Sequence, residues 1–110
     1  MAVEIANVVH ALAILDLNNP PSIMRGSGIA SVTRLGVGVY EVAADPPLNI
    51  TEGIAQVTPI EGAGPIVTAS IRDHGTFTPG NILISTFTNA GVAADIGGVN
   101  LTLMRIPQQL

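Results

Sequence analysis

The residues of this chain that could do chemistry are few and scattered. The only two histidines, His10 and His74, lie too far apart in the sequence to form a recognisable metal motif. Asp73 precedes His74, and a carboxylate in that place could orient the imidazole for acid–base catalysis. A polar turn at the end of a strand accounts for the same residues, and we favour the turn.

Other candidate sites receive similar structural interpretations. The pairs Gly26/Gly28 and Gly36/Gly38 resemble fragments of nucleotide loops, but neither opens a predicted helix, so we assign them to hairpins. Asp95 could offer oxygen to calcium, yet one carboxylate makes a poor site, and we expect a flexible loop there. No nucleophile elbow, phosphate-binding loop or zinc-protease helix occurs in the sequence. We therefore expect no catalytic, cofactor-binding or metal-binding residues, no cofactor and no enzymatic activity.

The composition points to protein partners. Hydrophobic residues make up 47% of the 110 residues and charged residues only 11%, whereas about 25% is usual for soluble domains. The charge of -4, with four arginines and no lysine, argues against nucleic acid. Such a weakly polar surface predicts a homo-oligomer, a trimer or similar closed ring. Arg34, Arg72 and Arg105 are candidates for intersubunit pairing, although we favour a solvated strand end for each. The absence of cysteine excludes disulfides and thiolate metal sites.

The N-terminal region, Val3 to Leu17, is apolar but resembles neither a signal peptide nor a membrane helix. It has no basic start, and Asn7, His10 and Asp16 interrupt it, so we expect neither export nor a membrane partner. The formal glycosylation sequons beginning at Asn49 and Asn100 are therefore not expected to be used.

The elements that must carry these residues are predicted to be strands of one domain. Val, Ile and Thr alternate with Gly, Pro, Asn and Asp from Gly26 onward. This pattern predicts strands at Ile29–Leu35, Gly38–Ala44, Ile54–Pro59, Ile66–Asp73, Ile82–Thr88 and Val99–Ile106. We expect an all-β fold, an antiparallel β-sandwich of jelly-roll-like form over residues 9–110, with residues 1–8 as an N-terminal arm.

The first strand is ambiguous in the sequence. Ile5, Val8, Leu12 and Leu15 fit one stripe of a helix, whereas Ala11, Ala13, Leu15 and Leu17 fit alternate positions of a strand. We favour a strand from Val9 to Leu17 because Asn and Pro residues end the run and the remainder is β. The aliphatic character of Val3 to Leu17 also predicts an interface element.

Turn residues separate the later strands. Gly36 and Val37 are predicted to form a two-residue hairpin loop with positive φ at Gly36. Strand breaks are expected at Asp45-Pro46-Pro47 and at Thr78-Pro79-Gly80-Asn81, because proline has no amide hydrogen for the ladder.

Two stretches carry a family resemblance, Ser31 to Val42 and Ile82 to Asp95. The first contains Thr33-Arg34, Gly36, Gly38 and Tyr40, and the second contains Thr86-Phe87, Gly91 and Asp95. Because both stretches occur in this order, the region from Gly26 to Ile106 resembles the small β-sandwich modules in virion proteins of tailed bacteriophages.

The resemblance implies a structural virion protein, and two roles stand first. One is a capsid decoration, or cement, protein that bridges major capsid subunits on the outer surface, and this is our first expectation. The alternative is a small tail, fibre or baseplate component, although Ile96 to Leu101 lacks the aromatic residue usual in the last strand of fibre tips. A cellular ligand-binding sandwich is the third interpretation.

Overall fold

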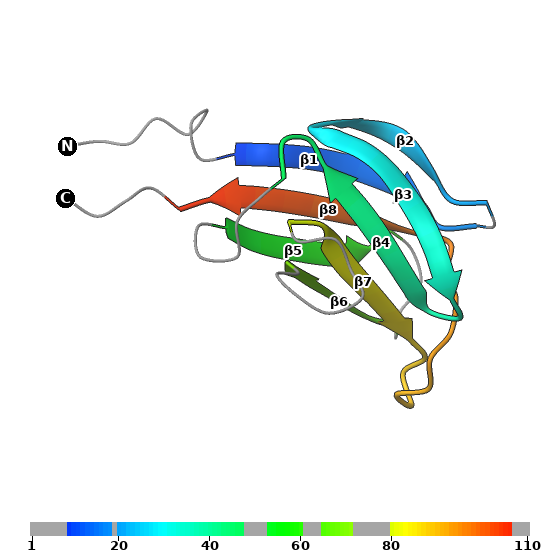
Figure 1. Cartoon of the computed structure of the whole chain (residues 1–110). Coiled ribbons are helices and arrows are strands. Elements are labelled where there is room, and N and C mark those ends of the chain that lie inside the picture. The colour runs from blue at the N-terminus through cyan, green and yellow to red at the C-terminus, as the bar shows by residue number, and fades with distance from the viewer. Residues whose placement is uncertain (1–8, 19, 48–52, 61–64, 72–79, 107–110) are drawn as a thin grey trace.

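The computed structural model describes residues 9–18, 20–47, 53–60, 65–71 and 80–106 (Figure 1). Throughout these ranges the regular structure is β, with no helix. The eight strands are β1 (Val9–Asp16), β2 (Ser22–Ser27), β3 (Ile29–Gly36), β4 (Val39–Ala44), β5 (Gly53–Pro59), β6 (Ile66–Ile71), β7 (Ile82–Phe87) and β8 (Gly98–Arg105). The all-β prediction is therefore confirmed.

The strands form two antiparallel sheets of four. Sheet A has the order β2-β1-β8-β5, and sheet B has the order β3-β4-β7-β6. Figure 1 shows β2 and β3 at one side of the molecule and β5 and β6 at the other. Each sheet therefore ends in an edge strand that lies near the corresponding edge of its partner.

The two sheets share one hydrophobic core. On β1, Ala11, Ala13 and Leu15 are buried while Leu12 and Ile14 are exposed, which is the alternation of a strand with one face against a core. Buried side chains of β4, β6, β7 and β8 complete the cluster, namely Tyr40, Val42, Ala44, Ile71, Ile82, Ile84, Val99, Leu101 and Leu103. Aliphatic side chains, with Tyr40 as the one buried aromatic among the described residues, thus fill the space between the sheets.

The predicted strands agree with the observed ones to within one residue at every described end. The strand interpretation of the N-terminal segment is confirmed, because Leu12 and Leu15 lie on opposite faces of β1 rather than on one helical stripe. Strand β6 ends at Ile71, and residues 72 and 73 of the predicted strand lie outside the described residues. The proposed arm, residues 1–8, lies outside them too.

Strand β2 is absent from the predicted strands because its sequence lacks an alternating pattern. Five of its six residues are exposed, and Arg25 and Gly26 interrupt the apolar residues. The strand exists because it pairs with β1 in register from Ser27 opposite Leu12 to Ser22 opposite Asp16, with one shift between Ile14 and Leu15. Pairing with a buried neighbour, rather than its own propensity, defines this strand.

The predicted turn of the β3–β4 hairpin is wrong by one residue. Gly36 is the last residue of β3 and pairs with Val39, so Val37 and Gly38 form the turn. The positive φ, 69°, belongs to Gly38 rather than to Gly36. A Cβ at Gly38 would also collide with the Thr86 carbonyl oxygen, so both the turn and its packing require glycine there.

Candidate functional site

The residues considered for acid–base or metal chemistry do not converge in the structure. His10 donates a hydrogen bond from Nε2 to the Pro46 carbonyl oxygen at 2.7 Å, which joins the start of β1 to the end of β4. His74 and Asp73 lie outside the described residues. Within the described ranges, no group of three or more His, Asp or Glu residues is placed to hold a metal ion.

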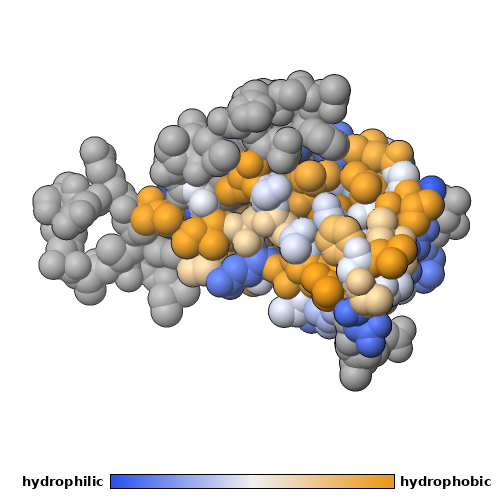
Figure 2. Space-filling view, turned by 90° about the horizontal axis from the view of Figure 1, so that it is seen from below, coloured by the Kyte–Doolittle hydropathy of each residue, from blue (hydrophilic) through white to orange (hydrophobic). Residues whose placement is uncertain are grey.

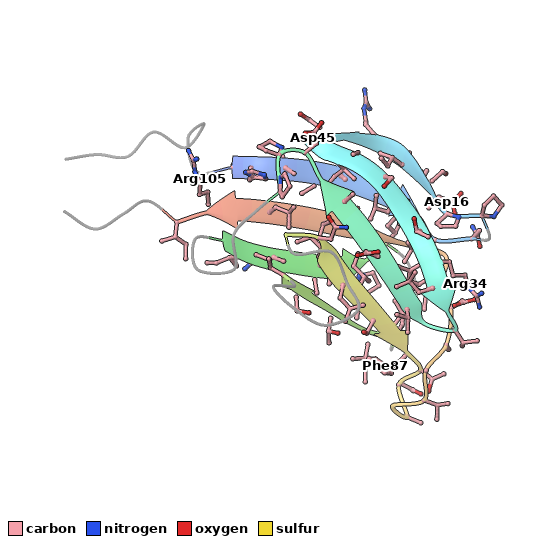
Figure 3. The ribbon with its side chains drawn as sticks, in the orientation of Figure 1. Asp16, Arg34, Asp45, Phe87 and Arg105 are labelled. Atoms are coloured by element: carbon pink, nitrogen blue, oxygen red, sulfur yellow. The ribbon has the colours of Figure 1, made fainter. Side chains whose placement is uncertain are left out.

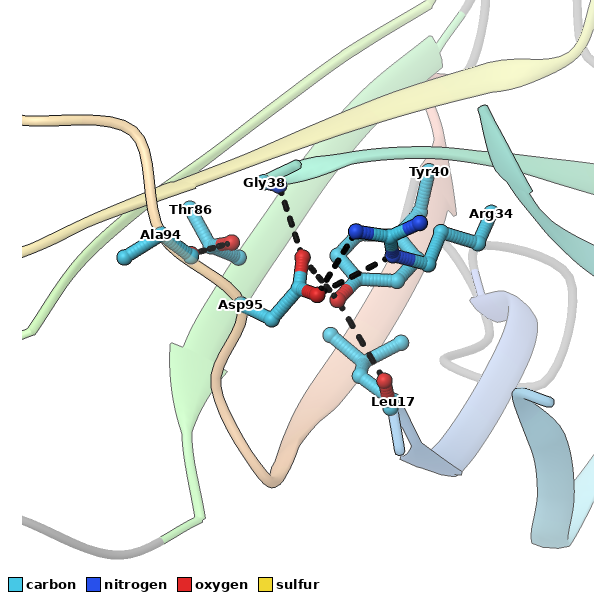
Figure 4. Close-up of polar contacts among 7 residues, drawn as sticks. All are labelled: Leu17, Arg34, Gly38, Tyr40, Thr86, Ala94 and Asp95. Carbon is cyan, nitrogen blue, oxygen red and sulfur yellow. Dashed lines mark hydrogen bonds and ion pairs between the residues drawn. The ribbon is translucent and has the colours of Figure 1, made fainter. Parts of the chain in front are cut away.

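Asp95 is the centre of the most extensive polar network in the described structure (Figure 4). One carboxylate oxygen, Oδ1, accepts hydrogen bonds from the Gly38 amide at 2.8 Å and from the Tyr40 hydroxyl at 3.0 Å. The other, Oδ2, accepts from Arg34, with Nε at 3.0 Å and Nη2 at 2.9 Å. The Leu17 carbonyl oxygen is a second acceptor for the Tyr40 hydroxyl, at 3.3 Å. The network therefore ties the loop before β8 to β3, β4 and the end of β1.

The loop that contains Asp95 is also held by its backbone. The Ala94 amide donates to the Thr86 carbonyl oxygen at 3.1 Å, and the Thr86 hydroxyl donates to the Ala94 carbonyl oxygen. Ala93 forms an isolated bridge with Phe87. Asp95 lies in a loop, as expected, and hydrogen bonds to both its carboxylate and the neighbouring peptide groups anchor that loop.

The network changes the ionisation of two of its members. Hydrogen bonding from the Gly38 amide, followed by that from Arg34, lowers the pKa of Asp95 below its usual value. Burial, followed by the hydrogen bond to Asp95, raises the pKa of Tyr40 to about 12. Both shifts favour the state in which a neutral phenol donates to a carboxylate, so the network is best suited to holding structure and has no proton ready to transfer near neutral pH.

The arginines selected as candidates for intersubunit pairing have different fates. Arg34 forms an ion pair with Asp95 of its own chain, so its guanidinium is bonded rather than free at a solvated strand end. Arg105 is exposed at the end of β8 (Figure 3), and Arg72 lies outside the described residues. Arg25, which the sequence pattern does not single out, is exposed on β2. The folded sheet places Arg25 beside the exposed Ile14 of β1, a position that the sequence alone does not reveal.

Charged side chains gather at the ends of strands. Figure 3 labels Asp16 at the end of β1, Arg34 near the end of β3, Asp45 just beyond β4 and Arg105 at the end of β8. Within the described strands, Arg25 and Glu41 are the charged residues nearer the middle, and Glu41 accepts a hydrogen bond from Asn81 at 3.1 Å. The middle of each sheet therefore presents mostly uncharged side chains.

The solvent-facing side of sheet A is one such surface. We call it the outer A face; along it Leu12 lies beside Ser27 and Thr102, Ile14 beside Arg25 and Asn100, and Ile54 beside Met104, with Gln56 and Thr58 completing β5. Leu12 is 51% exposed and Ile54 41%. Arg25 is the one charged residue among those named on the outer A face.

A shallow groove of about 380 Å³ lies on the outer A face over β1. Leu12 and Ile14 line it together with Arg25, Asn100 and Thr102 from the neighbouring strands. Aliphatic groups with neutral hydrogen-bonding groups around them suit contact with a protein surface, since they offer apolar area and few groups that are costly to desolvate.

No family model, curated protein or solved structure matches this chain in comparisons with known proteins. The described residues also contain no helix long and apolar enough to cross a membrane. The geometry of the chain itself must therefore carry any proposal about its function.

Proposed function

We propose that this chain is a non-enzymatic structural protein of a tailed-phage virion. Its first role would be that of a capsid decoration, or cement, protein, which bridges neighbouring major capsid subunits on the outer capsid surface. The observation that carries the proposal is the outer A face, which exposes Leu12, Ile14 and Ile54 among neutral polar residues. A surface of this kind suits coverage by other protein subunits.

The proposal includes a finer architecture and an oligomeric state. A β-sandwich of jelly-roll type is supported by the shared core and by the adjacency of β1 with β8 and β4 with β7, which brings strands distant in sequence together. A homotrimer or similar closed ring is supported by the low content of charge, because a symmetric interface would remove apolar surface from water. The net charge of -4 favours a protein partner over nucleic acid.

The mechanism of such a protein is mass action. A protein that binds the assembled shell more tightly than free shell subunits shifts the equilibrium towards the intact particle by its differential binding energy. Each copy needs to contribute only a few kcal/mol, because contacts around one capsomer act together. The apolar residues of the outer A face would supply the contact area, while exposed charges would mainly steer the encounter.

The role is tested on purified particles that contain this chain. Copy number per particle, measured by quantitative mass spectrometry, should be in the hundreds for a decoration protein, whereas a few to dozens would assign the chain to the tail. Particles that lack the protein should then release their genome at a lower temperature than complete particles. Equal release temperatures would contradict cementing, and absence of the chain from all particles would overturn the virion role.

A further inference from the structure

The groove on the outer A face is open to solvent and lies over strands that are already paired. Leu12 and Ile14, which line it, are 51% and 37% exposed. Strand β1 beneath them is hydrogen-bonded to β2 on one side and to β8 on the other. The backbone of β1 is thus used within the sheet, so a partner at this groove must be recognised through side chains.

Arg25 is the charged residue of this groove. The register places it beside Ile14, and Asn100 lies on the other side of Ile14. Arg25 is exposed and forms no ion pair or side-chain hydrogen bond with the described part of the chain, whereas Arg34 is paired with Asp95. A guanidinium has five N–H donors and no acceptor. These donors of Arg25 are therefore available to a partner.

The charge of Arg25, rather than apolar character, distinguishes the groove from other surfaces. Figure 2 views the molecule from the side where β5, β6 and β7 lie in Figure 1, and apolar and weakly polar residues cover most of the described surface there. Apolar residues alone would thus specify no particular partner. A single cation among aliphatic and neutral polar groups restricts the partners that can cover it, because a charge is costly to remove from water without a counter-charge.

Asp16 is a second charged residue on this face, but it does not line the groove. It follows Ile14 by two positions on β1 and lies opposite Gly98 of β8. Its Oδ1 accepts hydrogen bonds from the Asn18 amide at 2.9 Å and from Asn18 Nδ2 at 2.8 Å. The carboxylate of Asp16 thus holds the turn after β1, and the counter-charge for Arg25 must come from a partner.

We propose that this groove binds a protein segment in which an acidic residue lies between aliphatic residues. The aliphatic side chains would cover Leu12 and Ile14, and the carboxylate would accept two parallel hydrogen bonds from Arg25. Asn100 and Thr102 would bond to neutral polar groups of the segment. Nucleic acids and anionic membrane surfaces are poorer partners, because their binding requires clusters of cations rather than one.

The inference deepens the proposed function, on which it rests for the identity of the partner. The shell subunit would present a carboxylate between aliphatic side chains where the outer A face meets it. The binding chemistry is tested with peptides that contain no virion component. Failure of this inference and failure of the virion role are therefore separate results.

The test is a titration of the full chain with three peptides, followed by amide chemical shifts in NMR spectra. The first is acetyl-Gly-Ser-Leu-Glu-Leu-Ser-Gly-amide, and the other two have Gln or Lys in place of Glu. The Glu peptide should shift the amides of Leu12, Ile14, Arg25 and Asn100, with a dissociation constant of about 1 mM, as suits a small contact. The Gln peptide should bind about two- to fivefold more weakly, the value of a partly exposed ion pair, and the Lys peptide more weakly still.

Variants of two exposed arginines separate the local charge from the charge of the whole chain. Arg25→Gln should remove the preference for the Glu peptide, and Arg25→Glu should reverse it in favour of the Lys peptide. Arg105→Gln is the matched control, because it removes the same charge from an exposed residue of β8 that does not line the groove. This control should retain the preference of the wild type. The unliganded spectrum of each variant verifies its fold.

Four results would overturn the inference. The first is the absence of binding by any of the peptides up to about 10 mM, well above the range expected for this contact. The second is equal binding of the Glu and Lys peptides to the wild type, and the third is shift changes that lie outside the groove. The last is a preference for Glu that survives in Arg25→Gln or is lost equally in Arg105→Gln.

Discussion

Around Asp95, charged and polar side chains bond to one another within the chain, whereas β6 presents an uncharged strand edge. The first region fixes the β3–β4 turn and the loop before β8 through bonds from Arg34, Gly38 and Tyr40. The second has a regular ladder with β7 on one side and lies close to β5 of the other sheet. The comparison indicates that the few polar groups of this chain maintain the fold, while its uncharged surfaces are available for contact.

The largest effect on the Asp95 end is expected from Gly38→Ala. The substitution places a side chain at positive φ and forces it against the Thr86 carbonyl oxygen, so we expect a loss of about 2–4 kcal/mol in the free energy of unfolding. Gly91→Ala should cost less, because Gly91 has φ of 85° but an added Cβ would meet nothing within 4 Å. Gly36→Ala should cost least, since it has neither constraint. Denaturant titration should give that order; equal losses at all three positions would contradict the packing described at Gly38.

A smaller loss is expected from Asp95→Ala. Removing the carboxylate leaves the Gly38 amide, in a buried residue, without its acceptor and leaves the Tyr40 hydroxyl only the longer bond to the Leu17 carbonyl oxygen, which should cost about 1–3 kcal/mol of unfolding free energy. Arg34→Met is the matched comparison and should cost less, because the ion pair that it removes is partly exposed. If Arg34→Met proved as damaging as Asp95→Ala, the ion pair rather than the amide and phenol contacts would be the main contribution of the network.

The Tyr40 network should also set the alkaline stability of the protein. A pKa raised to about 12 in the folded state, against about 10 when unfolded, gives stability that is present below pH 10 and lost as the pH rises through 12. Tyr40 is the only tyrosine, and the chain has no lysine or cysteine, so few other side chains titrate in this range. Phenolate absorbance of the native protein should therefore follow Tyr40 directly. An ordinary pKa near 10 would contradict the burial and bonding described for it.

The sequence predicts the strands of the fold well, but it does not predict the hydrogen-bond network around Asp95. Alternation in Ile82 to Thr86 and Val99 to Leu103 follows from burial of one face, so the prediction of these strands is confirmed. Strand β2 and the role of Gly38 depend on neighbouring strands, which one sequence does not reveal. The sequence alone suggests a flexible loop at Asp95 because the partners of this residue lie 55 to 61 residues away. The available signal in the sequence is that Arg34, Gly38 and Tyr40 lie in one motif-like stretch, Ser31 to Val42, and Asp95 in another, Ile82 to Asp95.

The difference between the two regions can be measured directly by amide hydrogen exchange of the wild-type chain and of Asp95→Ala. The account predicts slow exchange of the Gly38 amide in the wild type, because it is bonded to Asp95, and much faster exchange in the variant. Amides of the β6–β7 ladder, which do not bond to Asp95, should change less. Equal exchange of the Gly38 amide in the two proteins would contradict the role of Asp95 in holding the turn.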